Sequence, residues 1–144
     1  MISSGTLLSL EAANAVGRFD ESLFIDYVDV EFGLRCQEKG FVSLVIKKAK
    51  MAHSLGEVPL KFWRWSLPSH APLRRRYQVR NAILLIRRRS IPLVWKLSEA
   101  VRILLRLIFA LIASGKSASV LSSWYLGLRD GVQGGKGKIS DNEF

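Results

Sequence analysis

Three carboxylates near the amino terminus have the spacing of acid–base groups. Asp26, Asp29 and Glu31 stand together in FIDYVDVEFGLR. Asp29 falls at the start of an expected helix, where a carboxylate facing a cleft can accept a proton from a hydroxyl group. The same pattern is also typical of a plain helix start, with Asp26 as the cap and all three acids at the positive helix end. The residues alone leave both interpretations open.

A histidine downstream is the second candidate. His53 ends an apolar stretch and precedes Ser-Leu-Gly. A neutral imidazole nitrogen can bind a metal. One histidine does not make a metal site, and a hydrogen-bonded structural role is the alternative. His70, in a Ser-His-Ala-Pro loop, is expected to be exposed.

The elements that would position these residues are mixed in type. Turn and periodicity signals predict a strand over residues 2–9 and a short helix over 10–16 that ends at Gly17. A helix over 28–39 follows, and the β-branched run 41–46 predicts a buried strand. The first third of the chain therefore predicts an α/β fold.

The remainder of the chain predicts helices. Residues 54–72 hold prolines and aromatic residues and predict an irregular connection. Helices are expected over 72–89, 93–112 and 117–129, with Pro92 separating the first two.

The expected helix 93–112 is apolar apart from one stripe of charge. Its charged residues recur every three or four positions: Lys96, Glu99, Arg102 and Arg106. Each basic residue at the centre of a bilayer costs roughly 2.5–3.5 kcal/mol on insertion scales, which disfavours a membrane span. The stripe favours a helix lying in the plane of a membrane interface.

The composition narrows the class of partner. The 49% hydrophobic content excludes a disordered chain, and the 24% charged content excludes a fully membrane-embedded one. The net charge of +10 favours an anionic partner: nucleic acid, an anionic membrane surface or a phosphorylated small molecule.

The arginines between residues 74 and 89 favour a membrane among these partners. Seven lie in that segment, and a solvated helix face is the plain alternative. Arginines beside an amphipathic helix suit anionic headgroups. No nucleic-acid partner is expected, because the pattern matches no known reader fold.

Features of the amino terminus and of the cysteine content bear on location. The single Cys36 has no partner for an internal disulfide, which indicates a reducing compartment. Residues 1–10 lack the basic and apolar regions of a signal peptide. We therefore expect a cytoplasmic protein that is peripheral to the inner face of the cell membrane.

Longer motifs give a resemblance. In order they are ISSGTL from Ile2, GRFDE from Gly17, FIDYVDVE from Phe24, HSLG from His53 and RRYQVRN from Arg75. Together they resemble the carboxy-terminal half of an inverting, family-2 glycosyltransferase of the rhamnosyltransferase type. The similarity covers about residues 2–89.

The resemblance implies a division of the chain and a fold. Residues 1–71 would be the acceptor side of a GT-A, Rossmann-like catalytic domain. Residues 72–131 would be a basic amphipathic helical region, and 132–144 a flexible tail.

The resemblance also implies roles for the two candidate groups. Asp29 would be the catalytic base that deprotonates the acceptor hydroxyl, so the resemblance favours the base interpretation. His53 would help to hold a divalent metal, Mg or Mn, that neutralises the departing nucleotide diphosphate. Asp26 and Glu31 would bind acceptor hydroxyls or support Asp29. Ser4 and Gly5 would line the cleft beside the acceptor.

One departure from the family pattern limits the expected activity. Enzymes of this family carry a nucleotide-binding βαβ unit and a DxD metal motif before this region, and this sequence has neither. We therefore expect a fragment of an enzyme that uses a nucleotide-sugar donor, such as dTDP-rhamnose, and a glycan or lipid-linked acceptor. Alone it should have little activity. The alternative is a non-catalytic, membrane-peripheral basic helical module.

Overall fold

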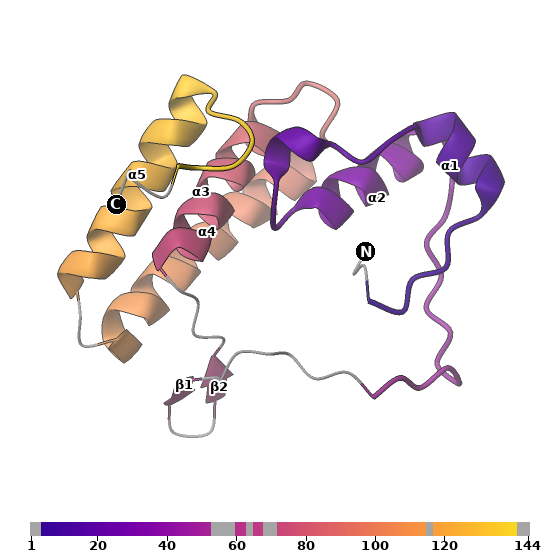
Figure 1. Ribbon diagram of the computed structural model, residues 1–144. Helices are drawn as coiled ribbons and strands as arrows, with labels where there is room; N and C mark the ends of the chain where they lie inside the picture. Colours follow the sequence, from indigo (N-terminus) through magenta and orange to yellow (C-terminus); the bar gives the residue numbers. More distant parts are fainter. Residues whose placement is uncertain (1–3, 53–59, 63–64, 68–71, 115–116, 141–144) are drawn as a thin grey trace. The chain divides into compact units, whose positions relative to one another are not determined.

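The protein folds as two compact units. The computed structural model describes residues 4–52, 60–62, 65–67, 72–114 and 117–140 (Figure 1). Unit 1 comprises Met1–Ser54 and Lys136–Phe144, and unit 2 comprises Leu55–Gly135.

Unit 1 is built around two helices. Helix α1 spans Leu10–Val16, and helix α2 spans Val28–Glu38 and packs against it. Ser9 starts α1, because its hydroxyl accepts the Ala12 amide at 3.1 Å. Gly17 ends α1 with a φ of 84°, which only glycine adopts easily. A 3-10 turn, Glu21–Leu23, lies between the helices.

The carboxy-terminal residues add to unit 1. The Gly137 amide donates to the Ser22 carbonyl at 2.6 Å, beside the 3-10 turn. Ile139 is buried. Residues 136–140, which fall in the predicted tail, therefore lie in a compact part of the chain.

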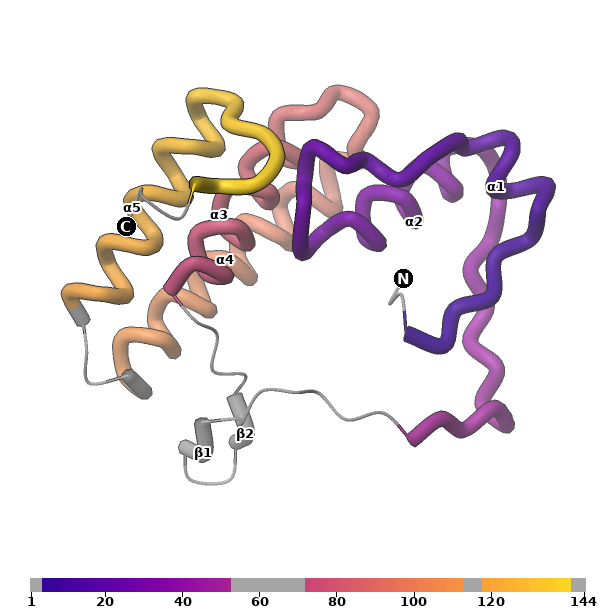
Figure 2. Tube along the Cα trace, in the orientation of Figure 1, coloured from indigo at the N-terminus to yellow at the C-terminus, as the bar shows by residue number. Residues whose placement is uncertain are grey.

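Unit 2 is mainly three helices. They are α3, Pro72–Ile86; α4, Leu93–Ser114; and α5, Ser117–Gln133. Strands β1, Leu60–Phe62, and β2, Trp65–Leu67, form an antiparallel pair in which Phe62 lies opposite Trp65. The three helices pack on one another, most extensively α3 on α5, and their traces run alongside in Figure 2.

Small residues allow α5 to approach the backbone of α3 closely. A Cβ on Gly127 would stand 2.7 Å from the Arg76 carbonyl oxygen, and one on Gly131 would stand 2.7 Å from the Ile83 Cβ. Ser123, one turn before Gly127, is also buried. The contact between the two helices therefore requires glycine at these positions.

An apolar cluster completes the core of unit 2. Val79 of α3 and Val120 and Trp124 of α5 are buried together. One side of α4 covers them with partly buried residues, namely Ile103, Leu107, Ala110 and Leu111. All three helices thus share one core.

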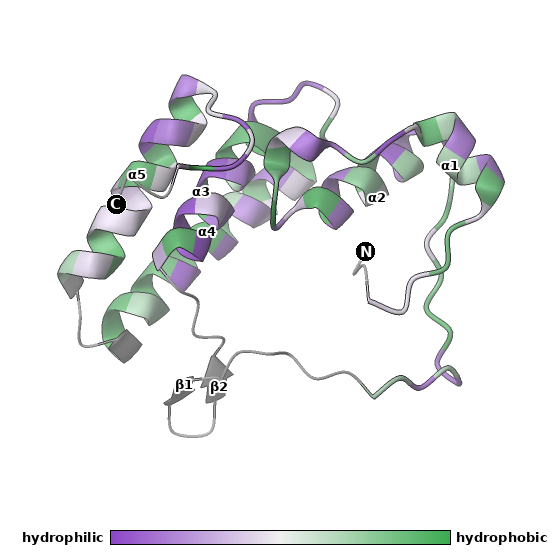
Figure 3. Cartoon of the chain, viewed as in Figure 1, coloured by the Kyte–Doolittle hydropathy of each residue, from purple (hydrophilic) through white to green (hydrophobic). Residues whose placement is uncertain are grey.

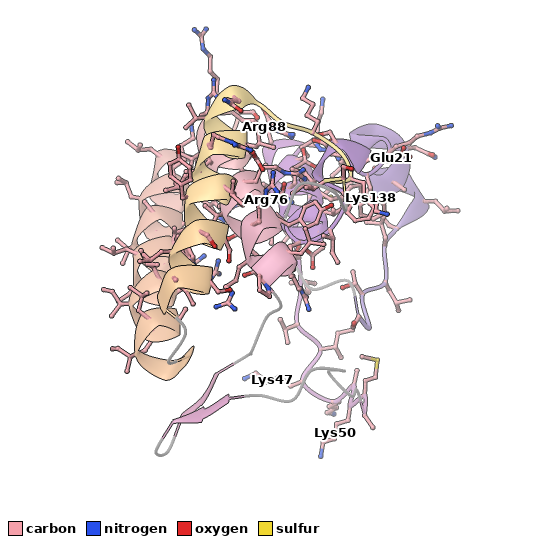
Figure 4. All side chains as sticks on the ribbon, turned by 60° about the vertical axis from the view of Figure 1, so that its left-hand side comes forward. Glu21, Lys47, Lys50, Arg76, Arg88 and Lys138 are labelled. Atoms are coloured by element: carbon pink, nitrogen blue, oxygen red, sulfur yellow. The ribbon has the colours of Figure 1, made fainter. Side chains whose placement is uncertain are left out.

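Two arginines of α3 are withdrawn from solvent. Arg76 and Arg80 are each 1% exposed, and Arg76 Nε donates to Asp130 Oδ2 of α5 at 2.6 Å. Figure 4 shows the Arg76 side chain within the helices of unit 2. Burial lowers the pKa of the Arg80 guanidinium, and the nearby Tyr77 and Asp130 oppose that shift. The arginine run is therefore not wholly a solvated face.

The predicted α/β fold is wrong. The described parts of both expected strands, residues 4–9 and 41–46, contain no strand. The described residues contain one short antiparallel pair and no parallel sheet, so the Rossmann-like prediction fails. A strand needs a neighbour to satisfy its backbone groups, and the described chain offers none to 41–46. Its β-branched residues are instead exposed, as at Val42 and Val45.

The predicted helices are confirmed. Each observed α-helix begins where the sequence predicted it, and Gly17 and Pro92 are local signals that mark two of the boundaries. The end of α1 also coincides with the prediction, and the ends of the other four described α-helices differ from it by one to four residues. No helix in the described part of the chain is both long enough and apolar enough to span a bilayer.

The close approach of α5 to α3 gives a first prediction. We expect Gly127→Ala to lower the free energy of unfolding by about 1–2 kcal/mol, because overpacking against the Arg76 carbonyl outweighs the gain in helix propensity. Thermal unfolding followed by circular dichroism measures this. Ser122→Ala, at an exposed position of the same helix, is the matched control and should change little. A higher midpoint for Gly127→Ala would show that the helices do not touch there.

Candidate functional site

Asp29 lies in the first turn of α2. Its Oδ1 accepts the backbone amide of Val30 at 2.9 Å, and the residue is half-buried. One carboxylate oxygen is thereby oriented by the backbone of the helix start, where the helix dipole favours negative charge. This placement restrains the geometry of Asp29 without burying it, as a base that meets a substrate requires.

The segment that delivers Asp29 has an unusual backbone. Phe24, Asp26 and Tyr27 have φ angles of 62°, 60° and 64°, in the left-handed region that non-glycine residues rarely adopt. Such residues cost roughly 1–3 kcal/mol each and cluster at functional sites. The strain lies immediately before Asp29, in the segment that the sequence singled out.

Asp26 does not cap α2. The residue at the cap position is Tyr27, which is left-handed and makes no side-chain cap bond. The prediction of an Asp26 cap is therefore wrong, because the chain enters α2 through left-handed residues rather than through an extended cap. Asp26 is half-buried, three residues before Asp29.

Glu31 is a buried acid with a firm partner. It is 2% exposed, and its Oε1 and Oε2 accept from Arg35 Nε and Nη2 at 2.8 and 2.9 Å. Such a bidentate pair fixes both groups. Of the two roles that the sequence left open for Glu31, this geometry favours support of the helix that carries Asp29.

Arg35 joins α2 to α1. Besides Glu31 it binds the Val16 carbonyl at 2.6 Å and the Arg18 carbonyl at 2.9 Å. Its guanidinium also lies 5.3 Å from the centre of the Phe32 ring. One arginine thus satisfies the carboxyl end of α1 and holds α2 against it.

Sequence reasoning missed Arg35. The signal was present, because a glutamate four residues before an arginine is a favourable helix pair. The contacts of Arg35 to the carbonyls of α1 depend on the packing of the two helices, which the local sequence does not reveal.

The predicted cleft residues Ser4 and Gly5 form a turn at the start of the described chain. Gly5 has a φ of 72°, and a Cβ built on it would lie 3.2 Å from Met51 Cε. The turn therefore lies against residue 51. Of the predicted site residues, Asp29 and Glu31 lie together on α2, whereas Gly5 lies next to Met51.

His53, the predicted metal ligand, lies outside the residues that the structure describes. Within the described ranges, no group of three or more His, Cys, Asp or Glu residues could hold a metal ion. The described residues therefore supply no metal-ligand set, and the metal stays a prediction.

A comparison with known proteins bears on the chemistry. Over 133 residues the chain is 38% identical to the dTDP-rhamnosyl transferase RfbF of Shigella flexneri. The resemblance to a rhamnosyltransferase-like glycosyltransferase is confirmed. The matched region is 92% of this chain and 45% of that protein, so the chain spans less than half of its relative. No family profile matches the chain, and no solved structure is significantly similar.

The Glu31–Arg35 pair gives a second prediction. Arg35→Ala leaves the Glu31 carboxylate buried without its partner. The free energy of unfolding should fall by about 3 kcal/mol, at the low end for a buried pair because Arg35 is partly exposed. We expect faster hydrogen exchange at the amides of α1 and α2. Glu38→Ala, at an exposed position of α2, is the control and should leave exchange unchanged. Unchanged protection in Arg35→Ala would contradict the account of how unit 1 is held.

Proposed function

We propose that the chain is the acceptor-side part of an inverting, family-2-type glycosyltransferase. It would act in transfer of a sugar, rhamnose in the first instance, from a nucleotide donor to a glycan or lipid-linked acceptor in polysaccharide synthesis. The similarity to a dTDP-rhamnosyl transferase over 92% of the chain carries this proposal. Because the chain covers under half of that enzyme, the donor site is proposed to need residues beyond these.

The proposed reaction is a single displacement with Asp29 as the base. The acceptor hydroxyl gives its proton to the Asp29 carboxylate while its oxygen attacks the anomeric carbon. The bond from that carbon to the nucleotide diphosphate breaks, and the configuration inverts. The half-buried position of Asp29 and its hydrogen bond from Val30 support this role.

The other candidate residues take supporting roles in the proposal. Glu31 holds α2 through Arg35 and so positions Asp29. Asp26 is proposed to contact acceptor hydroxyls, with Ser4 and Gly5 beside the acceptor. His53 is proposed as a ligand of a divalent metal, Mg²⁺ or Mn²⁺, which would neutralise charge on the leaving diphosphate.

A second candidate function is non-catalytic. The chain would then be a basic helical module at the inner face of the cytoplasmic membrane. The exposed apolar residues of α4 are the observation that favours it. A membrane location also suits the first function, because a lipid-linked acceptor lies in the membrane.

The third prediction tests transfer in a chimaera. This chain replaces the matching 133-residue segment of the Shigella flexneri transferase, and rhamnosyl transfer from dTDP-rhamnose is measured. We expect the chimaera to be active. Asp29→Asn should lower kcat by about 100-fold or more, because removal of a general base costs at least that much. Donor affinity should be unchanged.

One control variant and two contrary outcomes make this test decisive. Glu38→Gln removes an exposed carboxylate at the far end of α2 and should leave kcat unchanged. Full activity in Asp29→Asn would reduce Asp29 to a structural residue of the helix start. A folded chimaera that binds dTDP-rhamnose but does not transfer would favour the non-catalytic module.

A further inference from the structure

One side of α4 is apolar and exposed along the whole helix. Figure 3 shows its carboxy-terminal turns in the green of hydrophobic residues. The exposed residues, which we call the α4 row, are Leu93, Val94, Leu97, Val101, Leu104, Leu105, Ile108, Phe109 and Ile112. Apart from three adjacent pairs, successive members are three or four positions apart, so they share a side of the helix. Each is at least 43% exposed, whereas the opposite side packs on the core of unit 2.

A second apolar row, which we call the α5 row, lies on α5. Leu121, Tyr125, Leu128 and Val132 are spaced by three or four residues and are all exposed. Helix α5 contacts α4. Scattered apolar residues are ordinary on a protein surface, but two ordered rows on contacting helices are typical of an interaction surface.

Two arginines border the α4 row on one side. Arg102 and Arg106 donate to the carboxylate of Glu99 at 2.9 and 3.1 Å. Glu99 is 2% exposed, while the arginine side chains are 54% and 47% exposed. The buried acid therefore tethers two guanidinium groups beside the apolar row, with about half of each side chain reaching solvent.

The acids of unit 2 leave its accessible charge strongly basic. Leu55–Gly135 contains only three acidic residues, Glu57, Glu99 and Asp130. Glu99 and Asp130 are both buried and paired with arginines. An anionic lipid bilayer has anionic headgroups over apolar acyl chains. An apolar surface bordered by cations complements both layers. A second copy of the chain, also charged +10, would meet like charge.

We propose that the α4 row is the membrane-docking surface of this protein. Helix α4 lies in the plane of an anionic bilayer with the α4 row among the acyl chains and the α5 row beside it. Arg102 and Arg106 bind lipid phosphates at the headgroup level, in the geometry that Glu99 sets. The inference rests on the membrane location proposed above and assigns that location to particular residues.

The fourth prediction is binding of the 144-residue chain to lipid vesicles. Co-sedimentation is measured with phosphatidylcholine vesicles that contain phosphatidylglycerol and with phosphatidylcholine alone. The unaltered chain should bind the anionic vesicles more tightly, and salt should weaken the difference. Leu104→Asp should lower the partition coefficient by at least about tenfold, because it places a charge in the apolar row. The residue is exposed, so folding is not at risk.

A double variant tests the role of Arg102 and Arg106 in binding anionic lipid. The double variant Arg102→Gln, Arg106→Gln should lower binding to anionic vesicles by about tenfold and leave the weak binding to neutral vesicles unchanged. Soluble inorganic phosphate added at equal ionic strength to sodium chloride should compete no better than the chloride salt. Specific competition would identify a free-phosphate site instead and overturn the docking proposal.

Matched controls come from unit 1. Val45→Asp adds the same charge at an apolar residue that is 89% exposed, and Lys47→Gln with Lys50→Gln removes the same charge as the arginine pair. Figure 4 shows Lys47 and Lys50 on the segment that follows α2. Both controls should bind as the unaltered chain does. If they lose as much binding as the α4 variants, attraction is by total charge and the proposed surface is wrong.

Two further outcomes would overturn the proposal. One is vesicle binding that Leu104→Asp leaves intact. The other is concentration-dependent dimerisation that Leu104→Asp abolishes, without vesicle binding, which would make the occupant a second copy. Sugar transfer by the chimaera to a soluble acceptor should be unaffected by Leu104→Asp, so failure of docking and failure of the transferase proposal are distinguishable.

Discussion

A charge removed from water must be paired, and this constraint organises both units. Among the described residues, the buried acids are Glu31, Glu99 and Asp130, and each binds an arginine. In unit 1, the Glu31–Arg35 pair extends to the carbonyls at the end of α1. In unit 2, Arg76 and Asp130 join α3 to α5 over a sequence separation of 54 residues. An unpaired buried charge costs several kcal/mol, so each pair admits few alternative arrangements of its helices.

The two acids at the start of α2 differ in burial and in pairing. Glu31 has both oxygens engaged by Arg35 and is inaccessible. Asp29, two residues earlier, is half-buried and receives a backbone hydrogen bond. The first holds the helix and the second stands where a substrate could reach it. The proposed base therefore has a fixed geometry on a helix that the neighbouring Glu31–Arg35 pair secures, which suits proton transfer.

The helices could be predicted from the sequence because their signals are local. Ser9 and Gly17 define α1, and Pro92 separates α3 from α4. The strand that the sequence predicted over 41–46 is absent, because strand formation depends on a partner elsewhere in the chain and β-propensity does not supply one.

The site could be predicted in part. The acids at the start of α2 point to Asp29, whose role as the base stays a proposal, and the four-residue spacing of Glu31 and Arg35 indicates their pairing. The left-handed entry through Tyr27 had no local signal, because few residues other than glycine mark that conformation. The burial of Arg76 depends on Asp130 and on the glycines of α5, which are distant in sequence. These contacts follow from packing rather than from pattern.

The role of Asp29 is the central claim, and chemical rescue tests it most directly. In the chimaera with the Shigella flexneri transferase, Asp29→Ala removes the carboxylate and should abolish rhamnosyl transfer. Added formate, a small carboxylate, should restore transfer in a saturable manner, whereas chloride should not. Transfer by Asp29→Ala at the unaltered rate without formate would contradict the claim, because no base would then be missing.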